Sequence, residues 1–307
     1  MPSFKKHSPD IFLEISRNDS AMQYYPVNLG QFEDKKIACL TLDVEHDYGT
    51  LLTKPTFEGM RNIPLLVDFL NAKNIPLTCY VQGSLFETHG QDINYLSKLD
   101  VEYEPHSFSH PNPNTMDFEW EIAKSKVSYR AFFGKEPIGY RSPDGYIDGV
   151  HYYETLVHNG FKYDASVFPS FRPNRFNHLN HPVNPYYEYN KQIIEFPFSV
   201  LSPRIRVPIS LSYLKLFGGT FLKFLDVFPL SKLIIFDFHL HDLSSLSTFD
   251  EISFQNQLPA YQKAVYKRIY LSKGDQGFPV LNRFIETLQK SGYEFLKVED
   301  VFRGIGS

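Results

Sequence analysis

Short runs of apolar residues alternate with amphipathic stretches along most of the chain. Two runs, residues 36–43 and 75–81, have the length and composition of strands buried on both faces. Further strands are predicted at residues 101–104, 137–140, 161–166, 193–198, 233–239 and 294–298. The stretches between them repeat apolar residues at helical spacing, and the predicted helices are residues 57–71, 92–99, 117–133, 150–159 and 280–290. This alternation predicts parallel strands with helices outside them, as a barrel or a doubly wound sheet.

Three segments fall outside this alternation. Residues 1–35 are polar and irregular, and we expect an N-terminal extension there. Residues 169–189 are rich in Pro, Asn, His and Tyr and predict a long loop, a kind of segment that often carries function. Residues 243–277 are polar and aromatic, with helical spacing over 258–270, and indicate an insertion. The sequence therefore predicts an α/β fold with one domain over residues 36–303.

Composition narrows the classes of partner. The 307 residues are 42% hydrophobic and 16% aromatic, which is enough for a sizeable core. A net charge of −4 with mixed signs argues against nucleic acid as a partner. Cys39 and Cys79 both lie in apolar runs, which favours buried thiols over a disulfide. No signal peptide is evident, and no apolar stretch reaches the roughly 18 residues that a membrane span needs, so we expect a soluble, cytoplasmic protein.

Polar side chains follow five of the predicted strands. Because the carboxyl ends of parallel strands meet at one edge, chemistry is expected to gather there. The polar segments are residues 43–47, 106–110, 141–146, 164–166 and 237–242. Among them, His106 and His110 are four residues apart, a spacing that points both rings the same way on a helical turn. Two imidazoles and a carboxylate suit a transition metal that keeps a position open for water.

In this order the motifs resemble those of the polysaccharide deacetylases of the NodB-homology type, carbohydrate esterase family 4. The family's His-Ser/Thr-x-x-His and Arg-x-Pro-x-Gly motifs are matched fully by residues 106–110 and 141–145. Its Thr-Phe-Asp-Asp-Gly motif is approximated by Thr-Leu-Asp-Val-Glu at residues 41–45, and its last two motifs by residues 164–166 and 238–242. The resemblance implies a distorted (β/α) barrel of the NodB-homology type.

The resemblance also implies a metal site. His106 and His110 would be ligands, and Glu45 would supply the carboxylate, because Val44 stands where the family has its second aspartate. His46 and Asp47 are rival ligands. Zinc suits two histidines and one carboxylate, although cobalt, nickel, manganese and iron fit nearly as well.

The same resemblance implies roles in the reaction for four further residues. Asp43 would be the general base and Arg141 would orient it. A backbone N–H at Asp144 would hold the oxyanion, with Tyr146 of the same motif beside the substrate.

A histidine would then protonate the departing amine. His239 is favoured for this role, and His241 is the alternative. Asp164 would orient that histidine, or would only cap the turn after its strand.

The function implied is hydrolysis of an N-acetyl or N-formyl group on a sugar within a polysaccharide or its lipid- or nucleotide-linked precursor, as in surface-polysaccharide biosynthesis. Four rings of the predicted loop, His178, His181, Tyr186 and Tyr187, would either stack on the sugar or be ordinary surface residues. Two alternatives remain: a catalytically inactive carbohydrate-binding relative, suggested by Val44, and a metal-dependent amidase for a small non-sugar amide.

Overall fold

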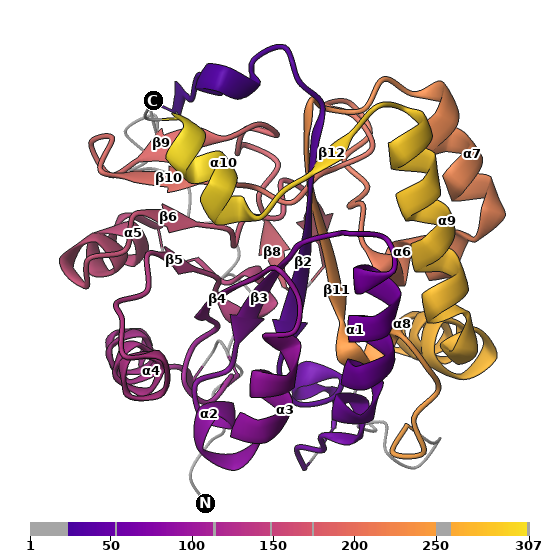
Figure 1. Ribbon diagram of the computed structural model, residues 1–307, viewed down its shortest axis with the longest axis horizontal. Helices are drawn as coiled ribbons and strands as arrows, with labels where there is room; N and C mark the ends of the chain where they lie inside the picture. The colour runs from indigo at the N-terminus through magenta and orange to yellow at the C-terminus, as the bar shows by residue number, and fades with distance from the viewer. Residues whose placement is uncertain are drawn as a thin grey trace, which may run out of the picture.

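The computed structural model describes residues 24–305 except for residues 53, 113–114, 148, 174 and 250–258. Most of the predicted N-terminal extension and part of the predicted insertion therefore lie outside the described residues. Within them, the alternation of strands and helices is present from residue 37 to residue 305 (Figure 1).

The strands agree closely with the apolar runs. In chain order they are β1 Tyr25–Pro26, β2 Ile37–Val44, β3 Leu77–Val81, β4 Val101–Pro105, β5 Gly139–Tyr140, β6 Tyr163–Asp164, β7 Phe171–Arg172, β8 Phe176–Asn177, β9 Tyr186–Glu188, β10 Ile193–Glu195, β11 Leu233–His239 and β12 Glu294–Phe295. The predicted loop at 169–189 thus contains the short β7–β8 hairpin and β9, which its polar composition concealed.

The helices include several that the sequence pattern did not predict. They are α1 Ile63–Asn71, α2 Leu85–Thr88, α3 Gly90–Leu96, α4 Phe118–Phe133, α5 Gly149–His158, α6 Leu211–Phe217, α7 Gly219–Val227, α8 Ala260–Tyr266, α9 Gly277–Lys290 and α10 Val298–Ile305. Of these, α2, α6, α7 and α10 are additional to the predicted set. A π-helical turn at Lys267–Ser272 continues α8.

Two sheets join into a distorted barrel. One runs β11-β2-β3-β4, with β12 also on β2, and the other runs β1-β9-β10-β6-β5. The Arg141 N–H donates to the Pro105 carbonyl at 3.1 Å, which connects β5 to β4. The Ser199 N–H after β10 donates to the Ile235 carbonyl of β11 at 3.1 Å, which connects the other two edges. The predicted distorted (β/α) barrel is confirmed.

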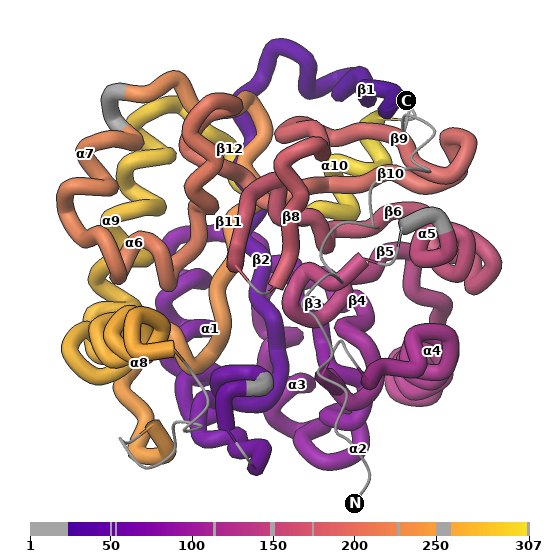
Figure 2. Tube along the Cα trace, turned by 180° about the vertical axis from the view of Figure 1, so that it is seen from behind, coloured from indigo at the N-terminus to yellow at the C-terminus, as the bar shows by residue number. Residues whose placement is uncertain are grey.

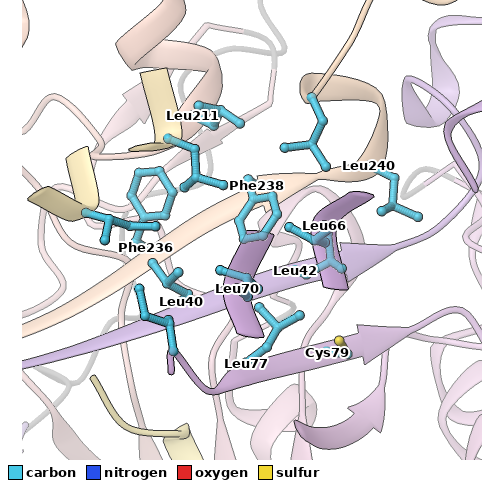
Figure 3. Close-up of a cluster of buried hydrophobic side chains, with 14 of the residues drawn as sticks. Leu40, Leu42, Leu66, Leu70, Leu77, Cys79, Leu211, Phe236, Phe238 and Leu240 are labelled. Carbon is cyan, nitrogen blue, oxygen red and sulfur yellow. The ribbon is translucent and has the colours of Figure 1, made fainter. Parts of the chain in front are cut away.

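Strand β2 shows how the barrel sorts its side chains. Successive residues of a strand face opposite sides, so Leu40 and Leu42 point outward into the core between the sheet and the helices. Figure 3 shows them packed with Phe236 and Phe238 of β11 and with Leu66 and Leu70 of α1.

Residues of the opposite parity face the barrel interior. Cys39 packs inside with Tyr163 and Ile235, and Thr41 and Asp43 continue along the same face. Val44 belongs to the outer core, so the parity of β2 leaves Glu45, two residues beyond Asp43, on the side of the interior. Both cysteines are free and buried, as predicted.

Helix boundaries follow local chemistry where it is clear. The Asp117 carboxylate accepts the Trp120 N–H and starts α4, and Gly134 ends it in a left-handed conformation at φ 68°. Seen from the opposite side, β1, β9 and α10 lie at one end of the molecule, away from α2 and α3 (Figure 2). None of the described helices is long and apolar enough to cross a membrane.

Candidate active site

A cavity of about 100 Å³ lies where the carboxyl ends of β2, β4, β5 and β11 meet. Its lining includes histidines, carboxylates, two arginines and the rings of three phenylalanines and a tyrosine. The lining residues are Asp43, Glu45, His106, His110, Arg141, Ser142, Asp144, Gly145, Phe168, Arg172, Phe176, Phe198, Pro208, Tyr213, Asp237 and His239. Seven of the residues predicted from the sequence are therefore brought together here: Asp43, Glu45, His106, His110, Arg141, Asp144 and His239.

Glu45 meets both histidines of the second motif. Its Oε2 lies 2.5 Å from His110 Nε2 and 3.2 Å from His106 Nε2. All three side chains are buried, and their ligand atoms fall within 4.8 Å of one another. Burial by itself raises the pKa of Glu45, but His110 and His106 outweigh it and hold that pKa well below its usual range. Burial alone would lower the pKa of His110, whereas the Glu45 carboxylate raises it to about 9.

The three side chains fit a divalent metal on a point of hydrogen-bond chemistry. His106 Nδ1 lies 2.9 Å from the Arg141 carbonyl oxygen, which can only accept, so the proton is on Nδ1. In the neutral imidazole, the form that binds a metal, this tautomer directs the lone pair of Nε2 at the Glu45 carboxylate. His106 Nε2 and Glu45 Oε2 then each offer a lone pair to the other across 3.2 Å, and a cation bound by both atoms would stabilise this arrangement.

The histidines do not lie on a helical turn, contrary to the prediction. Ser107 and His110 both have positive φ, at 53°, and residues 106–110 form a loop. The Glu121 carboxylate of α4 holds this loop: Oε2 accepts the N–H groups of Phe108 and Ser109 at 2.7 and 2.8 Å. The rings converge because of that support and not because of helical periodicity.

The rival ligands are directed elsewhere. Asp47 accepts the N–H groups of Glu58 and Gly59 at 2.7 and 3.0 Å and the Thr56 hydroxyl at 2.8 Å, so it organises the loop at 56–59. His46 Nδ1 lies 3.0 Å from Gln82 Oε1. Neither residue lines the cavity.

Asp43 is held by a buried arginine. Arg141 Nη1 lies 2.8 Å from Asp43 Oδ1 and 3.2 Å from Asp237 Oδ1, and it also donates to the Thr41 hydroxyl at 2.9 Å. The other oxygen of Asp43, Oδ2, lies 3.7 Å from His106 Nε2. The carboxylate is thus fixed on one side and open toward the histidines on the other.

Arg141 itself is 1% exposed, and its surroundings explain how the fold accommodates that charge. Its Nε donates to the Ala165 carbonyl at 2.8 Å, and its guanidinium carbon lies 4.0 and 4.3 Å from the ring centres of Tyr80 and Phe198. Burial lowers the pKa of Arg141, but Asp43 and its other neighbours outweigh this and raise it. A guanidinium sandwiched between rings and paired with carboxylates stays charged.

His239 reaches the cavity from the end of β11. Its Nε2 lies 3.8 Å from Asp43 Oδ2 and 3.7 Å from Glu45 Oε1, while its Nδ1 lies 3.2 Å from Asp242 Oδ2. Burial lowers the pKa of His239, but Asp237 and Asp242 raise it well above its usual value. Asp242 is fixed in turn by the Ser212 hydroxyl at 2.7 Å.

His241, the alternative to His239, does not line the cavity. Its Nδ1 accepts the Tyr48 N–H at 3.1 Å, and burial lowers its pKa to about 3. A ring in that state is neutral and has no proton to give at Nδ1.

Asp164 does not orient His239, and Asp242 does so instead. Asp164 Oδ1 accepts the Ser166 hydroxyl at 2.6 Å, and Ser166 Oγ accepts the Ser142 N–H at 2.7 Å. Burial raises the pKa of Asp164 to about 6. The reason for the difference is topological: Asp164 ends β6 in the second sheet, whereas Asp242 is three residues from His239.

The third motif shapes the wall of the cavity. Asp144 has a positive φ of 56°, and its Oδ2 accepts from Arg175 Nη1 at 2.6 Å. Gly145 follows at φ 67°, and a Cβ there would lie 2.8 Å from Phe168, so only glycine fits. Tyr146 does not line the cavity and lies half-buried beyond it.

The aromatic residues of the predicted loop are not a platform for sugar. His178, His181 and Tyr186 are buried, with His181 Nδ1 2.8 Å from the Tyr186 hydroxyl and the two imidazole centres 5.2 Å apart. They pack against one another and are absent from the cavity lining. Tyr187 of β9, half-buried, is also outside it.

Sequence reasoning gave no role to several side chains of the site, among them Asp237, Asp242, Glu121 and Arg172. Asp237 has the same strand parity as His239, and Asp242 is the last residue of the final motif, so the position of each could have pointed to the site. Glu121 and Arg172 carried no such signal, because each is brought to the site by a distant segment.

Comparisons with known proteins bear on the family and on the fold. Residues 33–160, which hold the first three motifs, match the family model described as Polysaccharide deacetylase, so the family resemblance is confirmed over that part of the chain. No curated protein matches the sequence.

Solved structures share the fold along most of the chain. Puue allantoinase is 15% identical with a TM-score of 0.60, covering 91% of this chain and 97% of its own. A Pseudomonas aeruginosa PAO1 protein described as a probable polysaccharide deacetylase is 14% identical with a TM-score of 0.58, covering 88% and 91%. A Mycobacterium smegmatis protein described as a polysaccharide deacetylase is 16% identical with a TM-score of 0.57, covering 89% and 91%. At these identities the likeness shows the fold alone.

Proposed function

Since residues 33–160 match the family model described as Polysaccharide deacetylase, we propose that this chain is a metal-dependent hydrolase that removes an N-acetyl or N-formyl group from a sugar. The sugar would stand in a polysaccharide or in its lipid- or nucleotide-linked precursor. One observation carries the proposal: Glu45, His106 and His110 converge at one point of the cavity. Beside them lie two side chains that can carry a proton, Asp43 and His239, with Asp43 Oδ2 3.8 Å from His239 Nε2.

Glu45, His106 and His110 would hold the metal, with zinc the first candidate and cobalt, nickel, manganese or iron fitting the same donors. When bound, the metal would act as a Lewis acid on the amide carbonyl and make a water more acidic. It would also relieve the opposition of lone pairs between His106 Nε2 and Glu45 Oε2.

The chain's own residues would move the protons. Asp43 would accept one from the attacking water through Oδ2, since Oδ1 is occupied by Arg141. The Asp144 N–H, in the wall of the cavity, would donate to the oxygen on which negative charge develops. His239 would give a proton from Nε2 to the departing amine, with Asp242 on Nδ1 to stabilise the imidazolium.

Metal content of the purified protein tests the centre directly. We expect about one metal per chain in the wild type and loss of it in both His106→Ala and His110→Ala. His151→Ala is the matched control, because His151 is an exposed histidine of α5 outside the cavity. Wild-type protein that stays metal-free after incubation with zinc or cobalt would contradict the proposal.

Acyl release tests the reaction. Acetate and formate are measured after incubation with a panel of N-acylated sugars and small amides. Release from a sugar, abolished by Asp43→Asn with metal retained, is the expected result. Bound metal without release from any acylated compound would favour the inactive relative, and release from small non-sugar amides alone would favour the amidase.

A further inference from the structure

A second cavity of about 310 Å³ adjoins the first. It lies between the β7–β8 hairpin, α6 and α8, and its lining is mainly aromatic and aliphatic. Phe168, Arg172, Tyr213, Asp237 and His239 line both cavities. The second cavity therefore begins at His239, on the side where the proposed reaction releases its amine.

Tyrosines supply much of this second wall. Tyr213 comes from α6, Tyr261 and Tyr266 from α8, and Tyr270 from the π-helical turn. Tyr261 is 54% exposed at the outer end, whereas Tyr266 and Tyr270 are buried. Flat rings along an open cavity suit the apolar faces of a saccharide.

Arg172 is the cation of this cavity. Its Nη2 donates to the Tyr266 hydroxyl at 2.6 Å, a neutral partner. Across the described part of the chain, no carboxylate forms an ion pair with it. The two other arginines near the site differ: Arg141 is paired with Asp43 and Arg175 with Asp144.

Asp144 acts on the half-buried Arg172 guanidinium only from beyond ion-pair distance, so an anion that reached Arg172 would give it a direct partner. Its planar set of donors matches the two oxygens of a carboxylate or phosphate. Arg172 lies on the wall shared by both cavities, so an anion bound there would belong to the unit next to the acylated sugar.

We propose that, given the proposed function, the second cavity takes the unit attached to the acylated sugar and that Arg172 binds a negative charge on it. The substrate class would then be acidic: either a saccharide with a uronate beside the N-acylated sugar or a sugar linked to phosphate.

Equilibrium binding tests the inference without relying on turnover. The titrated protein is Asp43→Asn, and the probes are a hyaluronan tetrasaccharide (carboxylates), UDP-N-acetylglucosamine (a diphosphate) and the uncharged, fully N-acetylated tetra-N-acetylchitotetraose, called chitotetraose below. We expect at least one charged probe to bind about 10- to 100-fold more tightly than chitotetraose, with the effect weakening in high salt. Preference for hyaluronan identifies a carboxylate, and preference for the nucleotide sugar identifies a phosphate.

Variants at Arg172 locate the effect. Adding Arg172→Gln should weaken the charged probe about 10- to 100-fold and leave chitotetraose unchanged, and Arg172→Lys should recover part of the loss. Arg204→Gln, an exposed arginine outside both cavities, is the matched control and should change nothing. Circular dichroism checks that each variant is folded.

Equal binding of all three probes, or a charged preference that survives Arg172→Gln, would overturn the inference. The two proposals fail separately. Acetate release from chitotetraose with no charge preference would keep the deacetylase and remove the role of Arg172. Tight, Arg172-dependent binding by Asp43→Asn, with no acyl release by the protein that retains Asp43, would support the anion site and contradict the proposed catalysis.

Discussion

The barrel buries carboxylates in two regions, and they behave in opposite ways. At the carboxyl ends of the strands, Glu45 faces His106 and His110, and its pKa is held well below its usual range. Deeper in the barrel, Glu102 of β4 meets only neutral donors, and burial raises its pKa to about 7. Both side chains are almost fully buried.

The partners of Glu102 show why. It accepts hydrogen bonds from the Thr78 hydroxyl at 2.8 Å, from the Glu299 N–H at 2.9 Å and from the Tyr163 hydroxyl. Its neighbour Glu104 accepts the Ile138 N–H at 3.1 Å and also has a raised pKa, chiefly from burial. Hydrogen bonds from neutral groups offset part of the cost of desolvation, but a nearby cation is needed to keep the charge.

Asp237 stands between the two regions. It lies 3.2 Å from Arg141 and yet burial, with Asp43 nearby, raises its pKa to about 7. Arg141 Nη1 lies closer to Asp43, at 2.8 Å, than to Asp237, at 3.2 Å. Burial alone therefore does not single out a candidate catalytic carboxylate in this barrel, and the proposed base, Asp43, is distinguished by its contact with Arg141 through one oxygen only.

The largest expected effect comes from removing the charge of Asp43. Asp43→Asn keeps the shape but cannot take a proton, so kcat for acyl release should fall about 10²- to 10⁴-fold. Metal content should stay at the wild-type value, because Asp43 is not among the three proposed ligands. A variant with near-normal kcat would place the base elsewhere.

A smaller loss is expected at Asp242. Asp242→Asn leaves His239 without an anionic partner on Nδ1, so kcat should fall about 10- to 100-fold with little change in KM. Ser212→Ala removes only one hydrogen bond to Asp242 and should cost less than Asp242→Asn. If the two variants matched in kcat, the charge on Asp242 would not be what His239 needs.

The raised pKa of Glu102 should make the free energy of unfolding depend on pH. Its folded pKa of about 7 lies above the roughly 4.3 of an unfolded glutamate, so the fold retains the proton longer. The stability that protonated Glu102 contributes is fully present below about pH 4.3 and is lost as the pH rises to about 7. The free energy of unfolding should fall by about 1–3 kcal/mol over this range.

Urea denaturation between pH 5 and 8 measures this. Glu102→Gln should flatten the decline in the free energy of unfolding, because glutamine does not titrate. Glu119→Gln, on the exposed face of α4, should retain the wild-type decline. An unchanged slope in Glu102→Gln would show that Glu102 is ionised in the fold.

The smallest effect is expected from the support of the histidine loop. Glu121→Gln keeps one acceptor oxygen but weakens the bonds to the Phe108 and Ser109 N–H groups, at a cost of about 1 kcal/mol. Thermal unfolding should show this, and metal affinity should fall by up to about tenfold as the rings lose their fixed positions. A loss of metal affinity as large as that of His110→Ala would show that Glu121 does more than hold the loop at residues 106–110.

Strand parity made much of the site predictable. β11 occupies residues 233–239 as the apolar run indicated, and Asp43 and Glu45 share a face because they are two residues apart. Positions set by contacts between distant segments were not predictable. The loop of His106 and His110 depends on Glu121 of α4, and the choice of Asp242 over Asp164 depends on which sheet holds β6. Arg172 reaches the cavity only through the β7–β8 hairpin.

Arg141 has a mechanical role as well as an electrostatic one. Its backbone N–H closes the junction between β4 and β5, and its side chain spans the interior to Asp43 on β2. The same residue thus connects two neighbouring strands through its backbone and crosses the barrel interior through its side chain. Because one residue makes both contacts, we expect a fluctuation that separates β4 from β5 at Arg141 to disturb the Asp43 carboxylate as well.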